Sequence, residues 1–286
     1  MCGRFGIALS IAKLEKRFNK PVEGIKTIEG KYGSLEKYIQ KCYNLSPGDY
    51  VPVITSTNPS VIQFSRFGFS PDWAKTDLMQ INARTEGSRN AENDVNYKGG
   101  KDIINTPMFR NAIRNSRCLV IADYFIEGTL TDKLNKPYVV YLRNKQRPFG
   151  MAGLHTMYTH KISGELIPNF AIITITANKL IEALPYNRMP VIIPRSRELQ
   201  WLNANEHLAS VTELLQPYPF EQMNAYRIAS EIKNPKNSGL QLITPLEPPI
   251  ITETEVQLNQ ILVQSGFGRL KFKKPDNNPE QNNFNN

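Results

Sequence analysis

The residue best placed to do chemistry is Cys2, because it occupies the second position of the chain. A small side chain there permits removal of Met1, so we expect the mature protein to begin with a cysteine that carries a free α-amine. The amine and the thiol have ordinary pKa values of about 7.7–8.0 and about 8.5, so both are partly deprotonated near neutral pH. Such a pair condenses with an aldehyde: the amine forms a Schiff base, and the thiolate then closes a thiazolidine ring. Position alone leaves equally open that Met1 is retained and that Cys2 is incidental.

Two nearby segments carry residue types that suit a binding site. Immediately after Cys2, Gly3 lets the backbone approach a ligand closely, and the guanidinium of Arg4 suits a phosphate. In residues 80–86, polar and small side chains alternate, so an extended backbone would project Asn82, Arg84 and Glu86 to one side. The alternative for the second segment is a solvated edge strand without a function.

Two later residues are candidates for proton transfer and ligand binding. Glu127 follows residues 118–126, the most apolar run of the chain, and a carboxyl at the end of a buried strand is a candidate general acid/base with a raised pKa. The other reading is a glutamate that merely leaves the core for solvent. A proline-bounded loop carries the phenol of Tyr186 and the guanidinium of Arg188, and loops of this kind often carry function.

These residues must be positioned by a fold in which most strands precede the helices. Apolar, β-branched and aromatic runs predict strands, the first two forming an antiparallel pair, at residues 50–54, 61–69, 118–126, 137–142, 149–154 and 170–176. Helical spacing predicts helices at residues 9–18, 177–184, 195–203 and 207–215. The class is therefore α+β. Residues 87–107 are polar and Asn-rich, which predicts a long surface loop.

Composition limits the class of protein. The chain has 286 residues and no apolar run long enough to cross a bilayer, which excludes a membrane protein. No signal peptide is visible, and the three cysteines show no CxxC spacing, so we expect reduced thiols, no metal and a cytoplasmic location. The net charge of +9 favours a polyanionic partner, although charge that only keeps a basic protein soluble explains it as well. We expect a monomer with one domain over residues 1–268 and a disordered polar tail over residues 269–286.

Seven segments resemble, in the same order, the motifs of the SOS response-associated peptidase (SRAP) family. They are residues 1–5 (Met-Cys-Gly-Arg-Phe), 43–48 (Tyr-Asn-Leu-Ser-Pro-Gly), 68–73 (Gly-Phe-Ser-Pro-Asp-Trp), 81–86 (Ile-Asn-Ala-Arg-Thr-Glu), 123–127 (Asp-Tyr-Phe-Ile-Glu), 187–190 (Asn-Arg-Met-Pro) and the Asn-rich turn 234–239. The resemblance implies an α+β fold with a mainly antiparallel, barrel-like sheet flanked by helices. It also implies a basic groove for single-stranded DNA and a thiazolidine cross-link between the N-terminal cysteine and an abasic site, with no metal or other cofactor.

The resemblance also implies roles for single residues. They are Cys2 as the nucleophile, Asn82 as the group that orients the cysteine or the sugar, Glu127 as the acid/base, Arg4, Arg84 and Arg188 as DNA contacts, and Trp73 as an aromatic that packs against the DNA. For Trp73, an ordinary core or surface position explains the residue equally well.

The chain departs from the family pattern at two positions. Tyr186 replaces the family's usual histidine, and a phenol with a pKa near 10 donates a hydrogen bond but does not shuttle protons at neutral pH as an imidazole does. We keep Tyr186 as a catalytic candidate and expect cross-linking with an altered rate, or weaker strand-cleaving side chemistry. Gly128 replaces the family's usual tryptophan after Glu127, so the pKa of that carboxyl is expected to be raised less.

Two other functions compete with this reading. One is an N-terminal nucleophile amidohydrolase or self-processing peptidase, in which Cys2 attacks an amide and its own amine is the base. Amide hydrolysis would regenerate a free enzyme, whereas the thiazolidine reaction leaves a stable adduct on DNA. The other is a non-catalytic binder of single-stranded or modified DNA, whose salt-dependent binding would survive Cys2→Ala.

Overall fold

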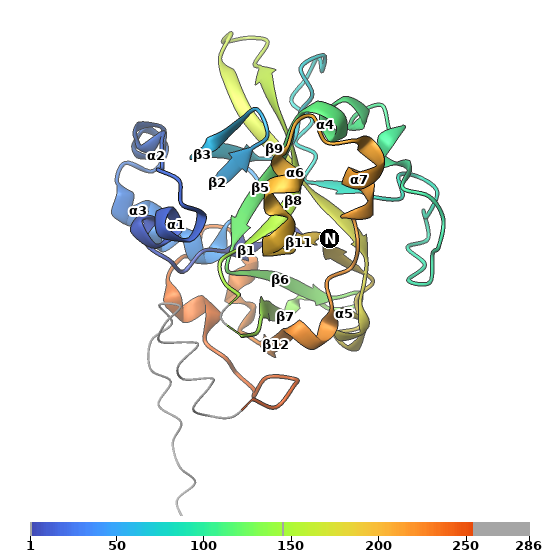
Figure 1. Ribbon diagram of the computed structural model, residues 1–286. Coiled ribbons are helices and arrows are strands. Elements are labelled where there is room, and N and C mark those ends of the chain that lie inside the picture. The colour runs from blue at the N-terminus through green and yellow to red at the C-terminus, as the bar shows by residue number, and fades with distance from the viewer. Residues whose placement is uncertain (1, 145, 254–286) are drawn as a thin grey trace, which may run out of the picture.

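The fold centres on a closed barrel, seen in a computed structural model that describes residues 2–144 and 146–253. Five strands close the ring, in the order β9 (Leu166–Thr176), β3 (Asn58–Phe67), β2 (Tyr50–Thr55), β5 (Arg117–Ala122) and β8 (Phe149–Thr159), which pairs back with β9. The β3–β9 contact is parallel and the other four are antiparallel. Figure 1 shows the ring in the upper half of the molecule. The expected α+β class with a mainly antiparallel, barrel-like sheet is confirmed.

Three short strands extend the barrel where ring strands end. The strand β4 (Asn82–Arg84) lies parallel to β9 and continues the edge that β3 leaves free. The strands β10 (Arg188–Pro190) and β11 (Ile192–Ile193) pair with β9 and β8, so the chain crosses from one ring strand to its neighbour. The segments that carry Asn82 and Arg188 are therefore both fixed to β9.

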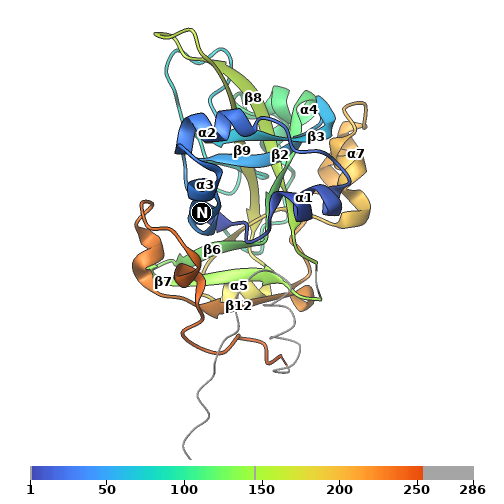
Figure 2. The ribbon, with the colours of Figure 1, turned by 90° about the vertical axis from the view of Figure 1, so that its left-hand side faces the viewer.

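A second sheet of four strands packs under the barrel. Its order is β1 (Phe5–Gly6), β6 (Tyr124–Thr129), β7 (Lys133–Leu142) and β12 (Met223–Arg227), all antiparallel. Figure 2 shows β6, β7 and β12 below the barrel strands. The prediction of one strand over residues 118–126 was wrong, because the run divides at Asp123 into β5 and β6, which belong to different sheets.

Asp123 directs the chain from one sheet to the other. Its backbone N–H donates to the carbonyl of Gly6 at 2.8 Å, and its carboxylate accepts the N–H of Ala8. The side chain is fully buried, and one of its oxygens has no hydrogen-bond partner among the described residues. Burial raises its pKa to about 6, against the opposing charges of Arg147 and Lys13.

Short helices cover the barrel on two sides. Figure 1 shows α1 (Ile11–Phe18), α2 (Ile25–Tyr32) and α3 (Leu35–Lys41) on one side, and α4 (Arg110–Asn115) and α7 (Leu208–Glu213) on the other. The remaining helices are α5 (Lys179–Ala183) and α6 (Glu198–Leu202). Single turns of 3-10 helix occur at Cys42–Asn44, Asp102–Ile104, Arg195–Arg197, Phe220–Gln222, Ser230–Lys233 and Leu240–Ile243. All four predicted helices are present in shortened form, whereas α2, α3 and α4 were not predicted.

The remaining predictions concern loops and ends. Residues 87–107 form an irregular segment of turns that contains one 3-10 turn, as expected for a long loop. The predicted tail, residues 269–286, lies outside the described residues, and the domain boundary at residue 268 stays a prediction. Within the part of the chain that the structure describes, no helix is long and apolar enough to span a membrane.

The buried carboxyl of Asp123 predicts a pH-dependent stability. Because its folded pKa is raised to about 6 from 3.8, its contribution is fully present below about pH 4 and is lost as the pH rises through 6. Relative to Asp123→Asn, the wild-type free energy of unfolding should fall by on the order of 2–3 kcal/mol across this interval. Urea denaturation of both proteins from pH 4 to 7.5 measures the difference, and parallel pH profiles would contradict the prediction.

Candidate functional site

The N-terminal strand carries Cys2 to the end of β6. In β1, Phe5 pairs with Phe125, and the N–H of Ile126 donates to the carbonyl of Arg4 at 2.8 Å. On its other edge, Phe5 exchanges two backbone hydrogen bonds with Leu45, at 3.0 and 3.3 Å. The segment is thus held from both sides, and the residues that precede Phe5 run toward Glu127.

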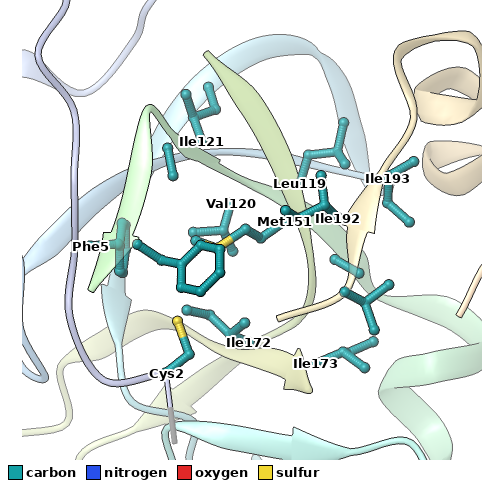
Figure 3. Close-up of a cluster of buried hydrophobic side chains, with 14 of the residues drawn as sticks. Cys2, Phe5, Leu119, Val120, Ile121, Met151, Ile172, Ile173, Ile192 and Ile193 are labelled. Atoms are coloured by element: carbon teal, nitrogen blue, oxygen red, sulfur yellow. The ribbon is translucent and has the colours of Figure 1, made fainter. Parts of the chain in front are cut away.

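The side chain of Cys2 is fully buried. Figure 3 shows it pointing into the apolar cluster that includes Phe5, Val120 and Ile172. Burial raises the pKa of the Cys2 thiol well above its usual range, and the nearby negative charge of Glu127 raises it further. In this state the thiol is protonated, and the pairing of β1 with β6 brings the backbone that precedes Arg4 alongside the Glu127 end of β6.

Glu127 has the acid–base properties expected of a proton shuttle. Its side chain is 3% exposed, and burial raises its pKa to about 7, partly opposed by the positive charge of the amino terminus. A group with this pKa both gives and accepts protons near neutral pH. The pKa of this carboxyl is raised although Gly128 follows it, because the surrounding sheet buries the side chain.

Asn82 and Arg84 lie next to each other on β4 but differ in exposure. Asn82 is 3% exposed, and neither atom of its amide has a hydrogen-bond partner among the described residues. A buried polar group without a partner usually costs free energy, which makes this amide ready to bind a ligand. Arg84 is half-buried, and no ion pair or hydrogen bond of its side chain occurs within the described chain.

Tyr186 and Glu127 share one pocket. It has a volume of about 580 Å³ and is lined by both residues and by Arg4, together with Gly3, Pro47, Ile81, Ile126, Gly128, Thr129, Leu130, Lys133 and Leu134. Three sequence-predicted site residues thus meet here, whereas Cys2 is not among the lining residues and lies in the apolar core cluster.

Arg4 is held in place by segments far away in the sequence. Its guanidinium donates to the side chain of Asn44 and to the carbonyl of Lys233, both at 2.9 Å. The amide of Asn44 in turn donates to the carbonyls of Asn234 and Asn237, both at 3.0 Å. Two of the seven matched segments, around residues 44 and 234–239, therefore serve to orient Arg4 at the pocket wall.

Arg188 does not lie where a phosphate can reach it. Its side chain is 2% exposed and makes a two-pronged ion pair with Glu86, at 2.9 and 3.1 Å. It also donates to the carbonyl and hydroxyl of Thr174 on β9. We correct its sequence-based assignment as a DNA contact, because the guanidinium is committed to buried partners. Glu86, expected beside Asn82 and Arg84, instead lies beyond the end of β4.

Trp73 is 57% exposed and lies in the loop between β3 and β4. Its neighbour Ala74 is buried against Tyr158 and Ile167, which fixes the loop to the β8–β9 hairpin. The indole is thus presented on a supported loop and is available to a partner.

Comparison with known proteins assigns the family. The family model of the SOS response associated peptidases (SRAP) matches residues 1–235. The chain belongs to the SRAP family. It is 29% identical over 249 residues to the abasic site processing protein YoqW of Bacillus subtilis, covering 85% of this chain and 99% of YoqW.

A more distant relative and a solved structure are also similar to this chain. The chain is 24% identical over 267 residues to the abasic site processing protein HMCES of Xenopus tropicalis, covering 83% of this chain and 76% of that protein. The crystal structure of a protein from Bacteroides thetaiotaomicron matches with a TM-score of 0.69 at 24% identity, over 86% of this chain and 100% of that one. This last similarity supports the fold.

The backbone of the β6–β7 hairpin explains why this SRAP chain has a glycine, Gly128, directly after Glu127. The pairing of β6 with β7 shifts register between Glu127 and Thr129, which marks a bulge. A Cβ atom at Gly128 would overlap the carbonyl oxygen of Lys133. In this hairpin, only glycine fits at the bulge without moving the backbone.

Sequence reasoning missed several residues that support the SRAP site. Asn44 and Asp123 were noticed only as members of motifs, although a buried polar residue inside a matched segment is a signal for a structural hydrogen bond. The Glu86–Arg188 pair joins positions 102 residues apart, and no local spacing predicts it. Among the described residues, no cluster of His, Cys, Asp or Glu could hold a metal ion.

The buried Glu86–Arg188 ion pair predicts that a single substitution lowers the free energy of unfolding more than the double substitution does. Glu86→Leu leaves the charge of Arg188 uncompensated in the core and should lower the free energy of unfolding by about 3–5 kcal/mol. Adding Arg188→Met removes that charge and should recover a large part of the loss. Chemical denaturation of the wild type, the single variant and the double variant measures both effects. A double variant no more stable than the single one would show that the pair is not the source of the loss.

Proposed function

We propose that this protein captures abasic sites in single-stranded DNA as a covalent thiazolidine adduct, through Cys2 after removal of Met1. The observation that carries the proposal is the buried carboxyl of Glu127, which has a pKa of about 7 and whose charge acts on the Cys2 thiol. The names of the relatives YoqW and HMCES, both abasic site processing proteins, support the same substrate. The proposal makes Cys2 the nucleophile and Glu127 the acid/base.

The proposed reaction begins at the amine of Cys2. The amine attacks the aldehyde carbon of the ring-opened sugar to give a carbinolamine, which loses water to form a Schiff base. Glu127 in its protonated form donates the proton that the departing hydroxyl needs. The thiol then adds across the C=N bond: sulfur bonds to carbon, the thiol proton passes to Glu127 and a proton is returned to nitrogen. The net products are the thiazolidine and one water molecule.

Two further side chains assist this reaction in the proposal. The amide of Asn82, which has no partner among the described residues, binds the sugar hydroxyl or the new amine and fixes its orientation. The hydroxyl of Tyr186, on the pocket wall beside Glu127, donates a hydrogen bond to the sugar. Neither residue has to change its protonation state.

The proposed DNA contacts are side chains that remain accessible at the surface or at the pocket wall. Arg84 is half-buried without an ion-pair partner in the described chain, Arg4 lies at the pocket wall, and Trp73 offers an exposed ring. Arginine binds phosphate with two parallel hydrogen bonds, and bases stack on an indole regardless of their identity. The net charge of +9 strengthens the attraction of a polyanion.

The adduct itself gives the first test. Intact mass spectrometry of the protein before and after mixing with abasic single-stranded DNA reports both loss of Met1 and addition of the DNA. The wild type should gain a denaturation-resistant adduct with loss of one water, and Cys2→Ala should gain none. Cys42→Ala removes another buried thiol and should still react. An undiminished adduct on Cys2→Ala would move the nucleophile elsewhere.

The role of Glu127 gives a second test. Glu127→Gln should slow adduct formation by about 10²–10⁴-fold, the usual contribution of a positioned acid or base. Only the protonated carboxyl donates to the departing hydroxyl, so the ratio of wild-type to variant rates should fall as the pH rises through about 7. Quenched time courses from pH 5.5 to 8.5 measure both rates. A constant ratio across this range would remove Glu127 from the proton transfers.

A further inference from the structure

The pocket beside Glu127 is larger than the proposed reaction requires. Its volume of about 580 Å³ lies within the range of about 300–1,000 Å³ that holds drug-sized ligands. A deoxyribose without its base is far smaller than such a ligand. Beyond Glu127 and Gly128, the pocket is lined by Leu130 from the turn after β6 and by Lys133 and Leu134 at the start of β7. A sugar bound at Glu127 therefore leaves this end of the pocket free.

The far end of the pocket is built from a braced turn. The hydroxyl of Thr129 donates to the carboxylate of Asp132 at 3.1 Å and accepts the N–H of Asp132 at 2.8 Å. The N–H of Leu130 donates to the carbonyl of Pro185 at 3.0 Å, which ties the turn to the loop of Tyr186, another lining residue. The turn and this loop are thus fixed relative to each other.

The side chains of this end combine apolar walls with positive charge. Leu130 is 54% exposed, Leu134 and Ile81 are half-buried, and all three line the pocket. Lys133 stands at a left-handed position, with φ 51°, where the backbone favours glycine or asparagine. Lys133 and Arg4 both line the pocket, so its lining carries two cations that suit a ligand with negative charge.

We propose that this end of the pocket binds the base of a nucleotide adjacent to the abasic sugar, with Lys133 and Arg4 beside its phosphate. A nucleotide combines a flat, largely apolar face with an attached anion, which matches the apolar walls and the two cations. Gly128 keeps the passage from Glu127 open, since the bulge excludes any side chain there. The inference rests on the proposed function and adds to it a dependence on the flanking base.

The test measures affinity for DNA in which the base on one side of the lesion is removed. Single strands carry a tetrahydrofuran residue, an abasic analogue without an aldehyde, flanked by adenine on both sides or by a second tetrahydrofuran on the 5′ or the 3′ side. Loss of the bound base should raise the Kd about fivefold or more on one side only. An equal, small effect on both sides would overturn the proposal.

Two variants assign the effect to the pocket. Leu130→Ala shortens the apolar wall and should reduce the difference in Kd between the base-bearing and base-free strands. Leu199→Ala removes a leucine that is 78% exposed on α6, outside the pocket lining, and should leave that difference intact. A difference that persists in Leu130→Ala would place the base elsewhere.

Adduct formation on genuine abasic DNA, measured in parallel, separates the two proposals. An adduct without any flanking-base effect overturns the pocket assignment and leaves the proposed function standing. If the wild type forms no adduct, the proposed function fails and this inference fails with it.

Discussion

The site depends on the pairing of a two-residue strand, β1, with β6. Phe5 is held between Phe125 on one edge and Leu45 on the other, and its ring is buried in the barrel core. This anchor determines where the preceding residues lie, and they meet the buried end of β6 at Glu127. Without it the N-terminal segment would be a free chain end, because a few residues cannot order themselves against their own conformational entropy.

Burial at this junction acts in opposite ways on the two groups to which we assign the proposed reaction, Glu127 and Cys2. It raises the pKa of Glu127 to about 7, which suits an acid at neutral pH, but it also keeps the Cys2 thiol protonated. The negative charge of Glu127 adds to the second effect. A protonated thiol is a poor nucleophile, whereas an α-amine titrates near neutral pH. In the proposed reaction, these pKa values favour an order in which the amine reacts first and the sulfur follows once Glu127 can accept its proton.

Features that depend on neighbouring residues in the sequence were predicted well. Features that depend on contacts between residues far apart in the sequence were predicted poorly. Glu127 was found because it ends an apolar run, and the hydrophobic runs located all five barrel strands. The division at Asp123 was missed because both halves of the run are buried, so no change of pattern marks it. The helix α3 was missed although Ser34 caps it by accepting the N–H of Lys37. The side chain of Arg188 is held by its ion pair with Glu86, and only the fold brings these two residues together.

The buried ion pair between Arg188 and Glu86 helps to explain how polar side chains are accommodated in a packed barrel. Arg188 and Glu86 satisfy each other beside β9, and this pair fixes the end of the segment that begins with Asn82. The amide of Asn82 lacks a partner within the described chain, which costs roughly 1–3 kcal/mol for a buried group. Strand pairing and the ion pair hold it there against that cost. A ligand that bonds to the amide would recover this free energy, so the unsatisfied amide favours ligand binding.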